Sequence, residues 1–166
     1  MPVKAFALEL KELSPEGRFE GLAATYNNTD QQGDVCLPGC FTNTLRSGTE
    51  RPLLWAHSAP VGLVELTDSA DGLVAKGTLS LGIQLGKDAY TLLKDGVVKG
   101  LSIGYQTVKE KLSGDVRQLV ELKLFEVSLV TFPANEMATI TSVKAVDQQI
   151  AIAVKSFRSE ILAALE

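Results

Sequence analysis

Side chains that bind metals are scarce in this sequence. Its 166 residues include one histidine, His57, and two cysteines, Cys36 and Cys40. Most structural and catalytic zinc sites need three or four nitrogen or sulfur ligands, so the composition excludes most of them. Any imidazole chemistry in this protein must therefore use His57.

The sequence also has no excess of positive charge and no long hydrophobic run. Its 16 basic and 20 acidic residues give a net charge of −4, which argues against a domain built mainly to hold nucleic acid. No stretch approaches the roughly 18 apolar residues of a membrane span. Charges at Lys4, Glu9 and Lys11 interrupt any secretory signal. We expect a soluble, intracellular protein without a nucleic-acid or membrane partner.

The two cysteines lie close together in C-L-P-G-C, residues 36–40. A disulfide between them would close only a tiny loop, and no other feature indicates an oxidising compartment. We expect two reduced thiols in a loop rather than a metal-binding or redox pair.

The amino-acid composition, with 45% hydrophobic and 22% charged residues, is that of an ordinary globular domain. A chain of this length suits one domain that buries about 70% of its unfolded surface. Alternation of apolar and polar residues predicts short strands, and two longer runs rich in β-branched residues predict the central antiparallel strands of a curved sheet or barrel. The short strands are expected at 5–10, 18–26, 52–57, 61–68 and 72–80, and the long ones at 97–112 and 116–132.

Three segments have helical patterns. Residues 40–46 predict a short helix, and residues 85–96 a longer one that ends at Gly96. From residue 145 to the end, apolar residues recur every three or four positions, without glycine or proline. This pattern predicts an amphipathic C-terminal helix that packs on the core or on a partner.

The string Gly100-Leu101-Ser102-Ile103-Gly104 fits G-x-S-x-G, the nucleophile elbow of α/β-hydrolases. Those enzymes order the triad as serine, acid and histidine, whereas His57 precedes Ser102 here. The elbow also requires a helix after the serine, but the following residues have a strand pattern. The α/β-hydrolase interpretation is therefore rejected.

A serine–histidine pair is still a hypothesis, because catalytic serines are defined by geometry and not by chain order. A serine hydroxyl needs a base within hydrogen-bond reach, and His57 at the end of an apolar strand is the available imidazole. Taken alone, His57 is more simply a structural or surface residue, and Ser102 between glycines a close-packing position. Gly100 and Gly104 would leave room for a substrate backbone.

A carboxylate normally orients the imidazole, and Glu126 is the favoured candidate. It is a charged residue within a very apolar strand, which costs free energy unless the charge is paired. Strand alternation places Glu126 and Ser128 on one face. The alternative is an edge-strand glutamate that faces water. Asp30 and Asp34 are rival carboxylates, although their string, D-Q-Q-G-D, is equally typical of a turn.

Six motifs follow one another along the chain: D-x-x-G-D (30–34), P-G-x-F (38–41), a strand that ends in His57 with Pro60-Val61-Gly62 after it, D-G-L (71–73), G-L-S-I-G-Y (100–105) and E-V-S-L-V-x-x-P-A (126–134). Their order resembles the HK97-type prohead (capsid maturation) protease family of tailed bacteriophages and prophages. The resemblance covers about residues 18–144, and the last two motifs are its most specific parts.

This resemblance implies an α+β, mainly β fold: a small antiparallel β-barrel flanked by helices, similar to the herpesvirus assemblins. It implies a protease core at residues 1–144, followed by the C-terminal helix at 145–166. His57 would be the general base, Ser102 the nucleophile and Glu126 the third member, because the second histidine of the herpesvirus relatives has no counterpart here.

The resemblance further implies a serine endopeptidase of capsid maturation that acts through an acyl-enzyme without metal or organic cofactor. Its substrates would be the scaffolding part of the major capsid protein and the protease itself, cut inside the assembling prohead in the host cytoplasm. A homodimer is expected by analogy. Arg51 and Arg117 are candidate oxyanion donors.

Two other functions are open at this stage. One is a non-catalytic scaffolding or capsid-assembly module on the same fold, and the other is an esterase that uses the G-x-S-x-G string. The first predicts that His57 and Ser102 are far apart, with side chains well beyond hydrogen-bond reach, and the second predicts turnover of small esters without peptidase activity.

Overall fold

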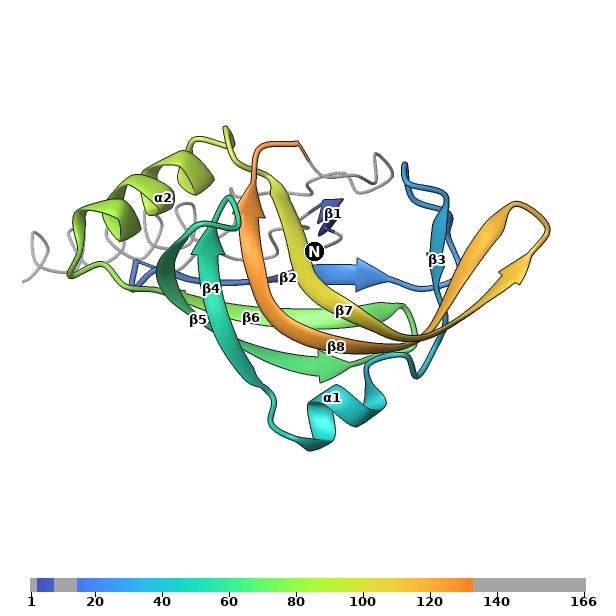
Figure 1. The fold of residues 1–166 in the computed structure, drawn as a ribbon. Coiled ribbons are helices and arrows are strands. Elements are labelled where there is room, and N and C mark those ends of the chain that lie inside the picture. Colours follow the sequence, from blue (N-terminus) through green and yellow to red (C-terminus); the bar gives the residue numbers. More distant parts are fainter. Residues whose placement is uncertain (1–2, 8–14, 133–166) are drawn as a thin grey trace, which may run out of the picture.

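The structure, a computed structural model, describes residues 3–7 and 15–132. These residues form eight strands and two short helices, so the fold is mainly β with helices beside the sheet (Figure 1). The strands are β1 (Val3–Ala7), β2 (Arg18–Thr25), β3 (Asp34–Cys36), β4 (Glu50–Trp55), β5 (Ala59–Asp68), β6 (Gly72–Leu79), β7 (Gly100–Ser113) and β8 (Val116–Val130). The helices are α1 (Thr42–Arg46) and α2 (Gln84–Lys94).

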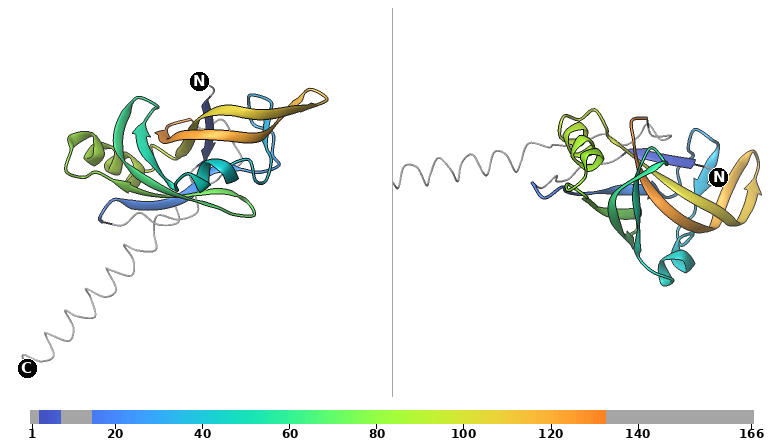
Figure 2. Two further views of the ribbon diagram at one scale, coloured as in Figure 1. Left: turned by 60° about the horizontal axis from the view of Figure 1, so that its bottom comes forward. Right: turned by 60° about the vertical axis from the view of Figure 1, so that its left-hand side comes forward.

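One sheet contains all eight strands, in the order β1-β7-β8-β4-β5-β6-β2, with β3 on the free part of β8. The end strands of this order, β1 and β2, contact each other, so the sheet curls most of the way round (Figure 2). No hydrogen-bonded ladder joins β1 to β2 in the described parts of the chain. The small β-barrel expected from the resemblance is therefore a strongly curled sheet whose two end strands are not paired.

The expectation that the barrel is antiparallel is wrong for two pairs of strands. Strands β3 and β4 both run parallel to β8, whereas the other neighbours are antiparallel. Parallel strands cannot be joined by a tight hairpin, so their pairing depends on contacts between distant segments of the chain. The β4–β8 pairing decides where the candidate site forms, because it sets the end of β4 beside the last third of β8.

The strand pattern follows from burial on one face. In β6, for example, Leu73, Ala75 and Leu79 are buried, while Lys76 and Thr78 are exposed. The largest fully buried side chains are Tyr105, Phe41, Leu53, Leu66, Leu73, Leu93, Leu101 and Ile103. They come from five different elements and the loop before α1, and they fill the inside of the curl.

The two helices lie where the sequence predicts them. Helix α2 packs Ala89 and Leu93 onto the core against β5 and β6. It ends at Lys94, with Asp95 as the C-cap residue. Gly96 follows with a φ of +68° and donates its N–H to the carbonyl of Leu93, as a C-terminal glycine does. Helix α1 contacts β8. The β7–β8 hairpin extends beyond the rest of the sheet at the end away from α2 (Figures 1 and 2).

Two further differences from the sequence expectations concern local segments. Strand β3 occupies residues expected to form turns, because a three-residue strand is too short to show alternation. The strand expected at 52–57 ends at Trp55, so His57 lies in the turn after it. The expected C-terminal helix, the domain boundary at residue 144 and the end of the first strand lie outside the described residues. No helix in the described ranges has the length and hydrophobicity to cross a membrane.

Candidate active site

His57 lies in a tight turn between β4 and β5. Ser58 donates its N–H to the carbonyl of Trp55 at 3.0 Å, and the two residues between them, Ala56 and His57, have φ values of +46° and +60°. Type I′ turns require positive φ at both central positions, where Asn-Gly is the usual pair. For other residues this conformation costs about 1 to 2 kcal/mol each and persists only where the surroundings impose it.

Strand β8 imposes this conformation. Ala56 donates its N–H to the carbonyl of Leu129, and His57 donates its N–H to the side-chain Oγ of Ser128, both at 3.0 Å. These bonds continue the parallel pairing of β4 with β8 past the end of β4. They orient the imidazole of His57 back over β8.

The imidazole contacts Glu126 directly. His57 Nδ1 lies 2.7 Å from Glu126 Oε1, with the His57 side chain 25% exposed and that of Glu126 10% exposed. A carboxylate accepts the Nδ1–H, which holds the neutral ring in the tautomer with a lone pair on Nε2. His57 Nε2 is buried and has no hydrogen-bond partner among the described residues. The ring is arranged as a general base requires.

The second oxygen of Glu126 is also engaged. Ser128 Oγ donates to Glu126 Oε2 at 2.6 Å, and the same Oγ accepts the His57 N–H. Burying a carboxylate costs free energy unless hydrogen bonds compensate it, and both oxygens have a donor here. The alternative of an edge-strand glutamate facing water is therefore wrong for Glu126.

Gly104 provides the space for this carboxylate. It is the residue opposite Glu126 in the β7–β8 pairing, and a Cβ added to it would lie 2.2 Å from Glu126 Oε1. The Glu126 side chain thus crosses over the backbone of Gly104, and its carboxyl group contacts His57. The room that the sequence assigns to a substrate backbone at this glycine is occupied by Glu126.

Ser102 lies on the same face as these groups. It is fully buried and pairs directly with Ser128 across the β7–β8 ladder, while Leu54 of β4 pairs with Ser128 from the other side. Directly opposite residues of an antiparallel pair project from the same face, about 4.5 to 5.5 Å apart. The structure shows no hydrogen bond between Ser102 and His57 Nε2. Such bonds are often longer without substrate and shorten in the reactive complex.

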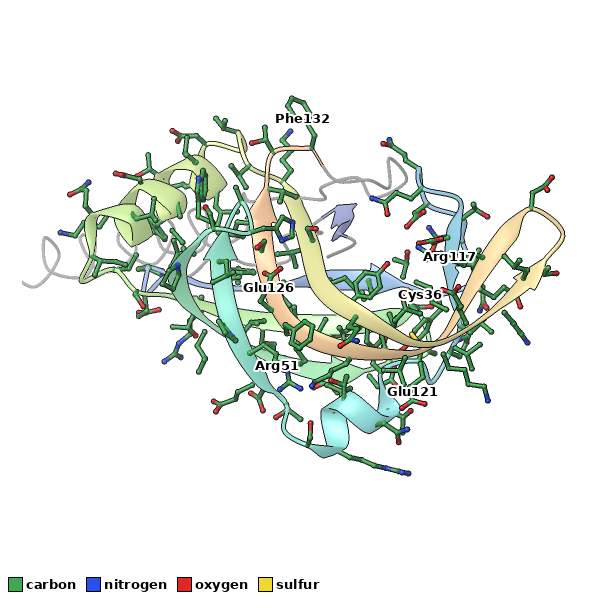
Figure 3. The ribbon with its side chains drawn as sticks, in the orientation of Figure 1. Cys36, Arg51, Arg117, Glu121, Glu126 and Phe132 are labelled. Carbon is green, nitrogen blue, oxygen red and sulfur yellow. The ribbon has the colours of Figure 1, made fainter. Side chains whose placement is uncertain are left out.

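Arg51 does not point into this site. Its guanidinium donates to the backbone carbonyls of Thr44, Gly48, Glu50 and Leu124, at distances between 2.6 and 3.1 Å. Figure 3 shows Arg51 beside α1, below Glu126. These bonds hold α1 and the loop after it against β4 and β8, so Arg51 is a structural residue and the oxyanion role expected as a possibility is wrong.

Arg117 is equally remote from the site. It is the second residue of β8, nine residues before Glu126, and lies far from that residue in Figure 3. Its guanidinium donates two hydrogen bonds to Asp34, at 2.7 and 2.5 Å. The bonds to Asp34 raise the pKa of Arg117 further above its ordinary high value. Asp34 is 1% exposed, and both of its carboxylate oxygens accept hydrogen bonds from Arg117.

The rival carboxylates are therefore structural. Asp34 pairs with Arg117, and Asp30 Oδ1 accepts the N–H groups of Gln32 and Asp34, both at 2.9 Å, as an aspartate in a turn does. Neither reaches His57.

The two cysteines are buried in the core and do not form a disulfide, as the sequence predicts. Cys36 ends β3 (Figure 3), and Cys40 follows in the loop before α1. Within the described ranges, no three His, Cys, Asp or Glu side chains are grouped to hold a metal ion.

Three features of the site were not predicted from the sequence: the positive-φ turn, the double contact of Ser128 and the carboxylate space at Gly104. Alternation in E-V-S places Glu126 and Ser128 on one face, so a link between these two side chains could have been predicted. The partners of Gly104 and the His57 N–H depend on strand register, which no local pattern records.

Comparison with known proteins identifies relatives among bacteriophages. Residues 6–151 match the family described as caudovirus prohead serine protease. The chain is 35% identical over 141 residues to the prohead protease of Enterobacteria phage HK97, an alignment that covers 80% of this chain and 62% of that protein. It is also 35% identical over 163 residues to the capsid polyprotein of Pseudomonas phage PAJU2, covering 90% of this chain and 24% of the polyprotein.

A more distant relative and a solved structure are also similar to this chain. The prohead protease of Escherichia phage T5 is 26% identical over 155 residues, covering 86% of this chain and 71% of that protein. The solved structure of the bacteriophage T4 capsid assembly protease, gp21, has a similar fold, with a TM-score of 0.64 at 10% identity over 80% of this chain and 97% of that one.

The chain thus spans less than two thirds of the length of the HK97 protease and about a quarter of the PAJU2 polyprotein. The family match nevertheless covers most of its residues, including His57, Ser102 and Glu126. This chain belongs to the caudovirus prohead serine protease family.

Proposed function

We propose that this chain is a serine endopeptidase of capsid maturation, with Ser102 as nucleophile, His57 as general base and Glu126 as the residue that orients His57. The observation that carries the proposal is the 2.7 Å contact between His57 Nδ1 and Glu126 Oε1, on the face of the sheet from which Ser102 projects. Since the sequence has a single histidine, no other imidazole can take this role.

The reaction would proceed through an acyl-enzyme. Ser102 Oγ attacks the carbonyl carbon of the scissile peptide bond while His57 Nε2 takes the hydroxyl proton. The protonated imidazole, stabilised by Glu126, gives that proton to the departing amine. Water then attacks the acyl carbon while His57 takes one of its protons. The bond between that carbon and Ser102 Oγ breaks, His57 returns the proton to Ser102 Oγ, and the second product leaves as a carboxylic acid.

The proposed substrates follow from the names of the relatives. Prohead and capsid assembly proteases act on capsid proteins, and one relative is itself a capsid polyprotein. We therefore propose the scaffolding part of the major capsid protein as the principal substrate and the protease itself as a second. The reaction would take place inside the assembling prohead in the host cytoplasm.

Two finer expectations belong to the same proposal. The curled sheet and its short helices support an assemblin-like core, completed by a helix at residues 145–166. A homodimer is the assembly state proposed by analogy with assemblins, and sedimentation of the purified chain measures it directly.

The test is incubation of the purified chain with capsid protein precursor, followed by mass spectrometry of the products. Ser102→Ala and His57→Ala should each lower the rate of cleavage by about 10⁶-fold. Glu126→Gln, which keeps the shape of the side chain but removes its charge, should lower it by about 10⁴-fold because the imidazole tautomer is no longer held.

Matched controls separate catalysis from folding. Glu65→Gln changes an exposed glutamate of β5, and Ser69→Ala removes a hydroxyl in the β5–β6 turn; both should cleave like the unchanged chain. A fluorophosphonate probe should label Ser102 and no other serine. Equal processing by Ser102→Ala would overturn the proposal, and a chain that neither cleaves nor reacts with the probe would indicate the non-catalytic assembly module instead.

A further inference from the structure

We infer that Ser128 is a positioning residue, whose hydroxyl holds His57 and Glu126 together in the geometry of the triad. Its Oγ accepts the His57 N–H at 3.0 Å and donates to Glu126 Oε2 at 2.6 Å. One hydroxyl thus binds the main chain of the proposed base and the side chain of the residue that orients it. The kinetic part of this inference rests on the proposed function, whereas the structural part does not.

The chemistry of the contact requires a hydroxyl. A group at this point must accept one hydrogen bond and donate another from the same atom, and serine and threonine hydroxyls do both. Alanine would do neither. Among the described residues, its removal would leave the His57 N–H and Glu126 Oε2 without these partners in a nearly buried site.

The position of Ser128 is set by the sheet and not by the site. It is fully buried, and it pairs with Ser102 of β7 on one side and Leu54 of β4 on the other. A residue held by ladders on both sides has little freedom to move. The hydroxyl can therefore act as a fixed point for the two groups that contact it.

Each contact of Ser128 controls a different degree of freedom. The bond to the His57 N–H helps to hold the turn in which Ala56 and His57 have positive φ. The bond to Glu126 Oε2 sets the rotation of the carboxyl group, so that Oε1 faces His57 Nδ1 at 2.7 Å. Together they would select the tautomer with the proton on Nδ1 and the lone pair on Nε2.

The tautomer is measurable because the sequence has only one histidine. In a ¹⁵N-labelled sample, at a pH where the ring is neutral, the two imidazole nitrogens give one assignable pair of signals. The unchanged chain should show a single tautomer, protonated on Nδ1. Ser128→Ala should show a mixture of both tautomers, and Ser128→Thr, which keeps the hydroxyl, should restore the single form.

Ser69→Ala is the matched control for a general loss of stability. The Ser69 hydroxyl also makes two bonds, donating to the carbonyl of Gly72 and accepting its N–H, but it lies in the turn at the other end of β5. It should leave the imidazole signals unchanged. Where Ser128→Ala does not fold, Ser128→Cys retains the volume with a much weaker donor and should give the same mixture.

Kinetics provide the second readout. In Ser128→Ala, kcat for cleavage of capsid precursor should fall by about 100-fold, the scale of a small misplacement of a catalytic group, while KM changes little. Ser128→Thr should recover most of kcat. A folded Ser128→Ala that retains the single tautomer and full kcat would overturn the inference.

The two proposals fail separately. If the unchanged chain cleaves nothing, the serine-protease function is wrong, and the tautomer measurement alone decides the role of Ser128. If the chain is active and Ser128→Ala retains the tautomer, the positioning role is wrong and the function stands.

Discussion

The absence of a side chain at Gly104 has a specific consequence for the site. In a strand interior, glycine usually weakens the strand relative to alanine by roughly 0.5 to 1 kcal/mol. Here a Cβ would overlap Glu126 Oε1, which lies across the glycine to reach His57. Gly104, the second glycine of G-x-S-x-G, thus leaves space for the carboxylate of Glu126 and is not part of a nucleophile elbow.

Gly104→Ala should therefore impair catalysis without unfolding the chain. Displacing the carboxyl group breaks its contact with His57 and should reduce the rate of precursor cleavage by about 100-fold. The control is Gly82→Ala, at an exposed position where an added Cβ meets nothing within 4 Å. A Gly104→Ala variant with the cleavage rate of Gly82→Ala would show that the carboxyl group is not needed in this place.

At the scale of elements, the β4–β5 turn combines an unfavourable backbone conformation with the proposed general base, His57. Ala56 and His57 both adopt positive φ, and bonds to β8 hold them there. Backbone conformations of this kind recur at active sites, where the surrounding structure compensates their cost. The turn is thus a place where stability can be gained without touching the imidazole.

Ala56→Gly should stabilise the protein by about 0.5 to 1 kcal/mol, because glycine adopts positive φ without steric cost. Urea unfolding measures the change. Ala59→Gly, in the extended backbone of β5 three residues later, is the comparison and should destabilise by a similar amount. Equal destabilisation by both substitutions would contradict the assigned backbone conformation of the turn.

One ion pair joins the side chains of β3 and β8, beside the backbone pairing of the two strands. Asp34 is buried and lies directly opposite Arg117 in the parallel register, with two hydrogen bonds between their side chains. Leaving a buried carboxylate without its partner costs more than an ordinary lost hydrogen bond.

Arg117→Ala should lower the free energy of unfolding by about 2 to 3 kcal/mol, since Asp34 would remain buried and charged. Arg46→Ala, which removes an exposed arginine of α1, should change it by less than about 0.5 kcal/mol. Cleavage by the folded fraction of Arg117→Ala should be normal, because Arg117 is far from His57. A loss of activity in that fraction would show that β3 has a role in catalysis.

At the scale of the whole molecule, the buried tyrosines limit stability at alkaline pH. Burial, together with the short hydrogen bond to Asp68, raises the pKa of Tyr26 well above its ordinary value. Burial and the nearby charge of Asp34 raise the pKa of Tyr105 in the same direction. Both phenols stay protonated in the folded chain at a pH where they ionise in the unfolded chain.

Because both pKa values are raised by folding, the free energy of unfolding should fall as the pH rises. A raised folded pKa stabilises the protein fully below the ordinary tyrosine pKa near 10, and this contribution is lost as pH rises above it. Urea unfolding at pH 9, 10 and 11 should show stability falling by up to about 1.4 kcal/mol per pH unit for each tyrosine. In the double variant Tyr26→Phe/Tyr105→Phe this slope should largely disappear; an unchanged slope would assign it to other groups.

Much of the fold was predictable because strands and helices leave local patterns. Alternation located β2, β5 and β6 to within a few residues, long runs rich in β-branched residues located β7 and β8, and three- and four-residue spacing located α2. The short β3 and the parallel pairings left no such pattern. A three-residue strand is below the length at which alternation is visible, and register between distant segments depends on burial across the sheet.

For the site, residue chemistry offered His57, Ser102 and Glu126 as candidates, with Asp30 and Asp34 as rival carboxylates, and the resemblance to the prohead protease family assigned the triad roles. One histidine, one serine in a distinctive motif and one charged residue in an apolar strand left few alternatives. Only the tertiary structure decided that β4 runs parallel to β8, which sets the His57 turn against Glu126 and Ser128. Local side-chain patterns encode which residues can do chemistry. The contacts that bring residues 57, 102, 126 and 128 together form only when the sheet closes over its core.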